Sequence, residues 1–405
     1  MGACDSSNSS RLRLENEMKE EFKNFQDVPS KHLSSSSIRT FSSSIFKSEN
    51  SKKKVSSKNG VTPSLSSTSL IFHNIKDLQK KDSSELFEKE NTFENTQYLL
   101  PETIAKREDV SKNYKLSKNE IGNGATSSVY PAEDSSKKKF AIKRINKNKI
   151  GKRKNMIINE AEICLKLNHK NIVKCYEIYE DMNYISIIME LGEADLFDLT
   201  LTNPLRVVSE EIAVDYLIQI FEAIDYLHNV ENIIHCDIKP ENFIVKFDKK
   251  NKKPILKLTD FGNIRKIPLN KERLHNYCGT KECMPPEALE KCGFNEKADE
   301  WAAGIMMYHV LTGSDPFTSN NDYGYKKNIK YKEIDFDIIK NKRLRELNKK
   351  LLNRSCEERI SAKEALIEIK KIKHHLKKNN NIISLKESKF NGIIETNKDS
   401  LTNMA

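Results

Sequence analysis

The sequence lacks the features that mark several large classes of proteins. Its eight cysteines contain no C-x-x-C pair and no cysteine–histidine spacing typical of a zinc site, which predicts reduced thiols in an intracellular protein rather than a disulfide framework. No apolar run approaches the roughly 18–20 residues that a membrane-spanning helix needs. The stretch from Trp301 to Leu311 is interrupted by His309 and is better interpreted as a buried helix. The N-terminus is rich in Ser and Asn instead of apolar residues, so no secretory signal is predicted.

The composition indicates a folded unit diluted by polar segments. Of the 405 residues, 37% are hydrophobic and 31% are charged, which is a low proportion of core-forming residues. Because a single core rarely exceeds roughly 250–300 residues, part of this chain is expected to form a tail outside the folded unit. The net charge of +11 admits nucleic acid, an anionic membrane or an acidic protein as a partner. Because Lys is spread along the whole chain, charge alone selects none of them.

The residue pattern divides the chain into four segments. Residues 1–113 are dominated by Ser, Lys, Asn and Glu, which predicts a disordered tail. Residues 114–191 alternate as strands do around one helical stretch, residues 192–376 are mainly helical, and residues 377–405 are again polar. Strands are predicted at 114–121, 128–132, 139–143, 173–180 and 184–190, and helices at 155–167, 210–229, 298–312, 342–353 and 362–376.

Two features of the sheet-rich segment suit phosphate binding. Gly122 and Gly124 lie in a strand–turn–strand context, where glycines let backbone N–H groups approach phosphate oxygens. A plain tight hairpin explains these glycines equally well. Lys143, on the next strand but one, is placed to hold phosphates, and Glu160 on the following helix can keep it aimed. For a lone pair of this kind, a surface ion pair is the simpler interpretation.

A third segment decides between these interpretations. It supplies a carboxylate to orient an attacking hydroxyl, and oxygen ligands for the metal ions that neutralise a triphosphate. These residues follow in order as Asp237, Asn242 and Asp260 in the strings His235-Cys236-Asp237-Ile238-Lys239-Pro240-Glu241-Asn242 and Asp260-Phe261-Gly262. A chance occurrence of three such strings in this order is rare.

Residues 114–376 therefore resemble the protein kinase superfamily, and specifically its calcium/calmodulin-dependent group. The resemblance implies an α+β bilobal fold, with a small antiparallel-sheet N-lobe at 114–191 and a larger helical C-lobe at 192–376. It also implies a Ser/Thr protein kinase that uses ATP and Mg²⁺. The Lys-Pro-Glu-Asn string after Asp237 is similar to that of Ser/Thr-specific rather than tyrosine-specific kinases.

The same resemblance implies a role for each site residue. Asp237 would be the catalytic base, with Lys239 near the γ-phosphate, and Asn242 and Asp260 would hold Mg²⁺. Lys143 would hold the α- and β-phosphates with Glu160 as its partner. The nucleotide base and ribose would contact Ile121, Val129, Ala141, Met189, Glu190, Leu191, Gly192, Asp195 and Ile244. The apolar members of this set could equally be ordinary core.

Two further landmarks support the resemblance in the second half of the chain. Gly279-Thr280, together with Pro285-Pro286-Glu287, is similar to the end of an activation segment, although family members usually have Ala where Pro285 stands. Glu287 is then expected to form a buried ion pair with Arg359. Asp299 is similar to the helix aspartate that braces the catalytic loop.

Two departures from the family pattern concern phosphate contacts. Ser127 replaces the third glycine of the phosphate loop, as in some active members of the group, so ATP binding is still expected. Cys236 stands where most regulated kinases have an Arg that pairs with an activation-loop phosphate. Residues 263–279 contain no Ser or Thr and only Tyr277 as a hydroxyl residue. Control by phosphorylation of this segment is therefore not expected.

Calcium regulation has little support in the sequence. No EF-hand loop is present. The basic stretch at 367–378 could suit calmodulin. The favoured interpretation is nevertheless the last helix of the domain with a Lys-rich solvent face.

The N-terminal residues predict a lipid anchor. Gly2 lies in an acceptor pattern for N-myristoylation, and Cys4 is placed for S-palmitoylation. Two acyl chains, helped by the basic run Lys52-Lys53-Lys54, would anchor the protein to the cytoplasmic face of a membrane. Without acylation the protein would be cytoplasmic.

Two alternatives to an active kinase remain. A pseudokinase scaffold is disfavoured because the catalytic residues are present, and a nucleic-acid-binding protein is disfavoured because no recognition motif accompanies the charge. Protein substrates are expected to carry basic residues near the target Ser or Thr, because Asp195 and Glu241 occupy positions that face substrate Arg side chains in similar kinases.

Overall fold

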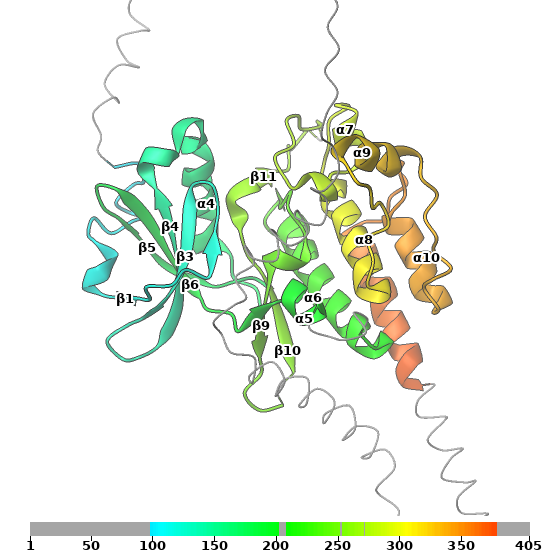
Figure 1. Cartoon of the computed structure of the whole chain (residues 1–405), viewed down its shortest axis with the longest axis horizontal. Coiled ribbons are helices and arrows are strands. Elements are labelled where there is room, and N and C mark those ends of the chain that lie inside the picture. The colour runs from blue at the N-terminus through cyan, green and yellow to red at the C-terminus, as the bar shows by residue number, and fades with distance from the viewer. Residues whose placement is uncertain (1–97, 202–207, 252, 271, 379–405) are drawn as a thin grey trace, which may run out of the picture.

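The computed structural model describes residues 98–201, 208–251, 253–270 and 272–378. These residues form a smaller lobe built around a sheet and a larger lobe of packed helices (Figure 1). The α+β class and the bilobal arrangement predicted from the sequence are confirmed. None of the helices in these ranges has the length and hydropathy of a membrane span. The proposed acylation sites Gly2 and Cys4 lie outside the described residues.

The sheet of the N-lobe is antiparallel, with the strand order β1-β3-β4-β6-β5 and with β2 paired to β3. The central strand β4 carries three consecutive buried residues, Phe140 to Ile142, as expected for a strand covered on both faces. Its register places Lys143 opposite Val129. The strands are β1 (Lys115–Leu116), β2 (Gly122–Asn123), β3 (Ser127–Glu133), β4 (Lys139–Asn146), β5 (Cys175–Glu180) and β6 (Tyr184–Glu190).

One long helix, α4 (Lys154–Lys166), packs against β5 and against the 3-10 turn η5 (Phe261–Asn263). Its buried residues Ile157, Ala161 and Cys164 recur at helical spacing and form one face. Glu160 is buried on the same side, with 4% of its surface exposed. The helix predicted at 155–167 is confirmed to within a residue.

The segment before β1 differs from the prediction. Disorder was predicted through residue 113, whereas residues 98–113 are packed against the N-lobe, with Leu100 and Ala105 buried. Lys106 exchanges backbone hydrogen bonds with β5, and the buried carboxylate of Glu180 accepts the N–H groups of Leu99 and Leu100 at 2.6 and 3.0 Å. The sequence hides this contact because the two partners are 80 residues apart.

The C-lobe is organised around α8 (Lys297–Thr312), which is buried along most of its length. Helix α6 (Glu210–Asn229), capped by Ser209, packs against it. The other helices are α5 (Leu196–Leu201), α7 (Pro286–Leu289), α9 (Asp322–Tyr331), α10 (Lys342–Leu351) and a last helix over residues 362–378. The four long helices predicted for this lobe are confirmed, with boundaries shifted by no more than two residues, whereas α9 was not predicted.

Short strands of the C-lobe flank the predicted catalytic residues. A three-stranded sheet runs β10-β9-β7, and β11 (Arg265–Lys266) pairs with β8 (Ile233–Ile234). Their bounds are β7 (Ala194–Asp195), β9 (Phe243–Phe247) and β10 (Pro254–Leu258). Strands of two to five residues are hard to recognise from alternation alone, because their pairing depends on distant segments.

The predicted ion pair between Glu287 and Arg359 is present. Arg359 donates through two nitrogens to the two carboxylate oxygens of Glu287, at 2.8 and 3.0 Å, and its guanidinium lies 5.0 Å from the centre of the Trp301 ring. Both partners are buried. This bidentate contact joins the end of the activation segment to the loop before the last helix.

Candidate active site

Lys143 lies at the centre of the first half of the site. Its ammonium is 2.6 Å from Glu160 Oε1 and 2.8 Å from Asp260 Oδ1. These three residues come from β4, α4 and the residue before the turn η5, so the fold brings together what the sequence separates by up to 117 positions. Asp260 has a positive φ of 63°, an uncommon backbone conformation for a non-glycine residue and one that recurs at functional sites.

The charges of this half are fixed by their neighbours. Burial by itself lowers the pKa of the Lys143 ammonium, but the carboxylates of Asp260 and Glu160 outweigh it and raise this pKa above its ordinary value. The Lys143 charge holds the pKa of Asp260 at about 2 against the opposing effect of burial. At neutral pH the lysine is therefore a cation and Asp260 an anion, as phosphate and metal binding require.

The catalytic loop, between β8 and β9, carries the second half. Asp237 is almost fully buried, with 3% of its surface exposed. Asn242 donates to the Asp237 backbone carbonyl at 2.8 Å and to its Oδ2 at 3.1 Å, and Lys239 Nζ lies 3.2 Å from the same Oδ2. Burial opposes ionisation of Asp237, but Lys239, hydrogen bonds from Thr280 and the nearby His235 outweigh it and lower its pKa. Asp237 is thus an ionised, oriented carboxylate.

Thr280 belongs to this centre, although no contact between Thr280 and Asp237 was predicted from the sequence. Its backbone N–H donates to Asp237 Oδ1 at 2.9 Å, and its hydroxyl donates to the same oxygen. The hydroxyl also accepts a hydrogen bond from Lys239 at 2.7 Å. A signal was available, because Thr280 is the only Ser or Thr between Asp260 and Pro285.

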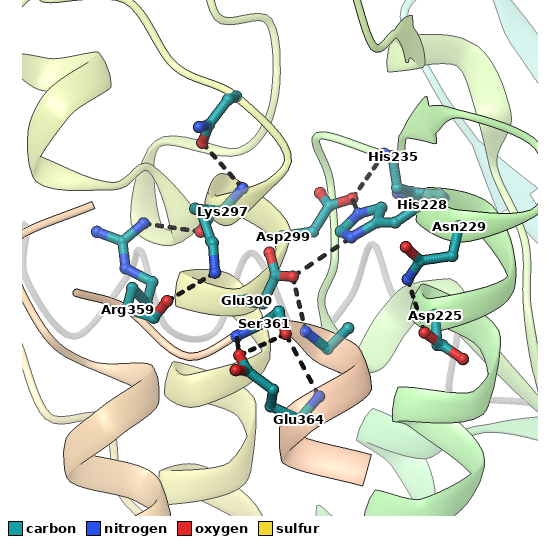
Figure 2. Close-up of polar contacts among 12 residues, drawn as sticks. Asp225, His228, Asn229, His235, Lys297, Asp299, Glu300, Arg359, Ser361 and Glu364 are labelled. Carbon is teal, nitrogen blue, oxygen red and sulfur yellow. Dashed lines mark hydrogen bonds and ion pairs between the residues drawn. The ribbon is translucent and has the colours of Figure 1, made fainter. Parts of the chain in front are cut away.

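The carboxylate of Asp299 on α8 binds the backbone of the catalytic loop (Figure 2). One oxygen of Asp299 accepts the N–H of His235 and the other accepts the N–H of Cys236, both at 2.8 Å. This is the bracing role predicted for Asp299. Cys236 has a positive φ of 65°, so both carboxylate bonds hold the backbone in the conformation that presents Asp237.

His228 and Glu300 extend this buried network, and neither was predicted. His228 Nε2 lies 2.8 Å from Asp299 Oδ2 and its Nδ1 lies 3.3 Å from Glu300 Oε1, as Figure 2 shows. Burial lowers the pKa of His228, but Glu300 and Asp299 outweigh it and raise this pKa to about 10. Glu300 Oε1 also accepts the N–H of Ala362, at the start of the last helix, at 2.8 Å. The network therefore links three helices to the catalytic loop.

The predicted base and ribose contacts lie on β3, β4, β6, β7 and β9 and on the residues next to β2 and β6. Ala141 pairs with Met189 across the sheet, and Asp195 pairs with Ile244. A Cβ at Gly192 would lie only 2.8 Å from the Cβ of Ile244, so glycine is required there by the close approach of these two segments. Ile121 is 53% exposed, as suits a residue at an open rim.

Two of the predicted contacts have additional partners. The carboxylate of Glu190 forms ion pairs with Lys246 and Lys257 at 2.7 and 3.0 Å. The backbone N–H of Glu190 donates to the backbone carbonyl of Lys174 at 2.9 Å. Asp195 Oδ1 accepts the N–H of Asp198 at 2.7 Å. Burial, with smaller contributions from Asp198 and Glu241, raises the pKa of Asp195 to about 7. The Asp195 carboxyl is therefore harder to ionise than an exposed aspartate.

The glycine loop and the predicted metal ligands fit a nucleotide with its metal. A Cβ at Gly122 or Gly124 would meet only ordinary contacts of 3.5–3.6 Å, so packing does not require glycine at these positions. The remaining reason for glycine is that it lets a ligand approach the backbone closely. No cluster of three or more potential metal ligands occurs among the described residues. Mg²⁺ usually takes one or two carboxylates together with substrate phosphates, and the side chain of Asp260, 44% exposed, offers such a carboxylate.

Comparison with known proteins agrees with this geometry. Calcium-dependent protein kinase 6 of Plasmodium berghei is 36% identical over 229 residues, covering 56% of this chain and 15% of that protein. Calcium-dependent protein kinase 4 of Plasmodium falciparum is 31% identical over 288 residues, covering 68% of this chain and 53% of that protein. Calcium/calmodulin-dependent protein kinase type IV of Rattus norvegicus is 33% identical over 227 residues, covering 55% and 46% respectively. These alignments span about half the relatives' length or less.

The family assignment rests on more than half of the chain. The family model described as protein kinase domain matches residues 115–369, a range that contains the whole site from Ile121 to Thr280. The chain belongs to the protein kinase domain family.

Proposed function

We propose that this protein is an active Ser/Thr protein kinase that transfers the γ-phosphate of ATP to hydroxyl groups of protein substrates. The observation that carries the proposal is that two charged groups of residues lie on adjoining segments, since the N–H of Thr259, next to Asp260, donates to the backbone carbonyl of Asn242 at 2.8 Å. Lys143, paired with Glu160 and Asp260, forms one group, and Asp237, bonded to Lys239, forms the other. Asp237 and Asp260 are held as carboxylates and Lys143 as an ammonium, which are the charges that phosphoryl transfer requires of a protein.

In the proposed reaction the protein mainly positions the two substrates and neutralises the charge of the triphosphate. A bond forms between the substrate hydroxyl oxygen and the γ-phosphorus, the bond from that phosphorus to the β–γ bridging oxygen breaks, and ADP leaves. Asp237 accepts the hydrogen bond of the attacking hydroxyl and takes its proton as the new bond forms. Because its pKa is lowered, Asp237 orients the hydroxyl in the ground state and accepts the proton late.

Lys143 and Lys239 would neutralise phosphate oxygens. Asp260 and the side-chain oxygen of Asn242 would hold Mg²⁺, which when bound withdraws charge from the triphosphate. The adenine would lie between the apolar side chains of Val129, Ala141 and Ile244.

Regulation and location are also part of the proposal. The absence of Ser and Thr from residues 263–279 supports activity that is independent of activation-loop phosphorylation, so phosphatase treatment should leave the basal rate largely unchanged. The N-terminal pattern with Gly2 and Cys4 supports anchoring to the cytoplasmic face of a membrane. Calmodulin is a less favoured partner, because the helix at 362–378 packs into the C-lobe through Ile369 and Ile372.

The decisive experiment compares Asp237→Asn with the wild-type full-length chain. Asp237→Asn should bind ATP·Mg²⁺ almost normally and lower kcat on a basic peptide by about 10²-fold or more, because it removes the carboxylate that orients the hydroxyl. Asp337→Asn is the control, since this carboxylate is 87% exposed and far in sequence from the site. Wild-type-like transfer by Asp237→Asn would refute the mechanism, and ATP binding without transfer by the wild type would favour a pseudokinase scaffold.

A further inference from the structure

Tyr277 joins the activation segment to the catalytic loop. Its hydroxyl donates a hydrogen bond of 2.7 Å to the backbone carbonyl of Cys236, which precedes Asp237. The donor and acceptor are separated by 41 residues. Tyr277 is also the only side-chain hydroxyl between Asn263 and Gly279. The segment that lacks phosphorylatable Ser and Thr is thus attached by a neutral hydroxyl.

With this contact, both backbone polar groups of Cys236 are hydrogen-bonded. Asp299 accepts the Cys236 N–H at 2.8 Å, and Tyr277 donates to the carbonyl of the same residue. Cys236 itself is 1% exposed and adopts a φ of 65°. With both backbone polar groups bonded, the strained conformation immediately before Asp237 is fixed from two sides.

The ring of Tyr277 provides the second part of the attachment. It packs edge-on against Phe294, with the ring centres 5.1 Å apart at 80°. Phe294 belongs to a small apolar cluster with Ile234, Cys236 and Ala298. Leu274, in the same segment, exchanges two backbone hydrogen bonds of 2.8 Å with Phe294. An apolar cluster therefore occupies the region where other regulated kinases are expected to have an Arg–phosphate pair.

Residues 277–280 connect the contact of Tyr277 with Cys236 to the side chain of Asp237. A Cβ on Gly279 would lie 1.8 Å from the Cys236 carbonyl oxygen and 2.8 Å from the Tyr277 ring, so the chain passes too close for any other residue. The next residue, Thr280, contacts Asp237 through its N–H and its hydroxyl. A displacement of Tyr277 would therefore reach Asp237 within three residues.

We propose that Tyr277 is a positioning residue that holds the activation segment in its working conformation, in place of a phosphate bound by the missing Arg. The proposal rests on the proposed kinase function and explains how that kinase can work without activation-loop phosphorylation. Burial raises the pKa of the Tyr277 phenol well above its ordinary value, so the hydroxyl remains a donor throughout the physiological pH range.

The test uses the full-length chain and two variants of Tyr277. Tyr277→Phe removes the hydroxyl and keeps the ring, whereas Tyr277→Ala also removes the contact with Phe294. Tyr331→Phe is the matched control, because this tyrosine is 73% exposed on α9. We would measure kcat and KM for ATP and for a basic peptide, and amide hydrogen exchange over residues 265–280, with α8 as the internal reference.

Tyr277→Phe should lower kcat by about threefold to tenfold, as expected for one lost hydrogen bond, with the KM for ATP unchanged. Exchange should accelerate in residues 265–280 and not in α8, and Tyr277→Ala should show both effects more strongly. Unchanged kcat, a fall in kcat without faster exchange, or an equal fall in Tyr331→Phe would overturn the proposal. Exchange requires no turnover, so an inactive wild type would refute the kinase function while the exchange data still decide the role of Tyr277.

Discussion

Glu300 places a second carboxylate against His228, with 3.3 Å between Oε1 and Nδ1. The imidazole therefore lies between two buried acids, because Asp299 contacts its other nitrogen at 2.8 Å. In the folded protein His228 is an imidazolium at neutral pH, since its pKa is raised from 6.5 to about 10. This buried charge is one contact away from the backbone before Asp237, because Asp299 binds both His228 and the N–H groups of His235 and Cys236.

The raised pKa of His228 predicts a dependence of stability on pH. The folded pKa exceeds the unfolded one, so the stabilisation is complete below about pH 6.5 and is lost as the pH rises through about 10. We expect the difference in unfolding free energy between wild type and His228→Gln to shrink from pH 6.5 to pH 10 in denaturant titrations. Glu300→Gln should move this decline to lower pH, since one of the acids that raise the pKa is removed. A pH-independent difference would contradict an imidazolium.

Two substitutions separate phosphate binding from metal binding. Lys143→Met should abolish detectable turnover and leave the fold intact, because it removes the cation between Glu160 and Asp260. Asp260→Ala should abolish turnover through loss of Mg²⁺ binding. Nucleotide binding measured with and without Mg²⁺ distinguishes the two variants. Only in Asp260→Ala should Mg²⁺ no longer increase the affinity for the nucleotide. Lys152→Met, an exposed change in the 3-10 turn Gly151–Arg153 before α4, is the control. Turnover within tenfold of wild type in Asp260→Ala would exclude its assigned role.

Substrate preference should be basic upstream of the target residue and should depend on pH. The pKa of Asp195 is about 7, so its charge, and with it the attraction for a substrate Arg, should grow between pH 6 and pH 8. Two peptides that differ only by Arg and norleucine measure the preference as a ratio of kcat/KM. Asp195→Asn should reduce this ratio by about tenfold and flatten its pH profile. A preference for acidic or proline-directed peptides would refute the assignment.

Membrane attachment should require Gly2. In cells, Gly2→Ala should release the protein into the cytosol, whereas loss of Cys4 alone should leave weak, reversible binding, because a single acyl chain is marginal. Fractionation combined with mass spectrometry of the N-terminal peptide measures both effects. Replacing Lys52, Lys53 and Lys54 by Gln would isolate the contribution of charge. A wild-type protein found in the cytosol with an unmodified Gly2 would end this part of the proposal.

The motifs of the site were recognisable in the sequence because phosphoryl transfer demands particular residue types at short spacings. Asp237, Lys239 and Asn242 lie within six residues, and Asp260 lies in a string of its own. The long helices were equally accessible, since helical periodicity is a local property: α6 was predicted at its exact bounds. What the chain encodes locally was thus sufficient to predict the family and the two lobes, and to single out the residues of the proposed site.

Only the tertiary structure decided which distant residues meet. Thr280 contacts Asp237 across 43 residues, Glu300 contacts His228 across 72 and Glu180 caps the segment at Leu100 across 80. Local patterns do not show which residues these side chains meet, because each contact depends on the path of the whole chain and on which buried polar groups still need a hydrogen-bond partner. The sequence by itself determined the chemistry available to this protein, and packing determined how its catalytic carboxylate is held.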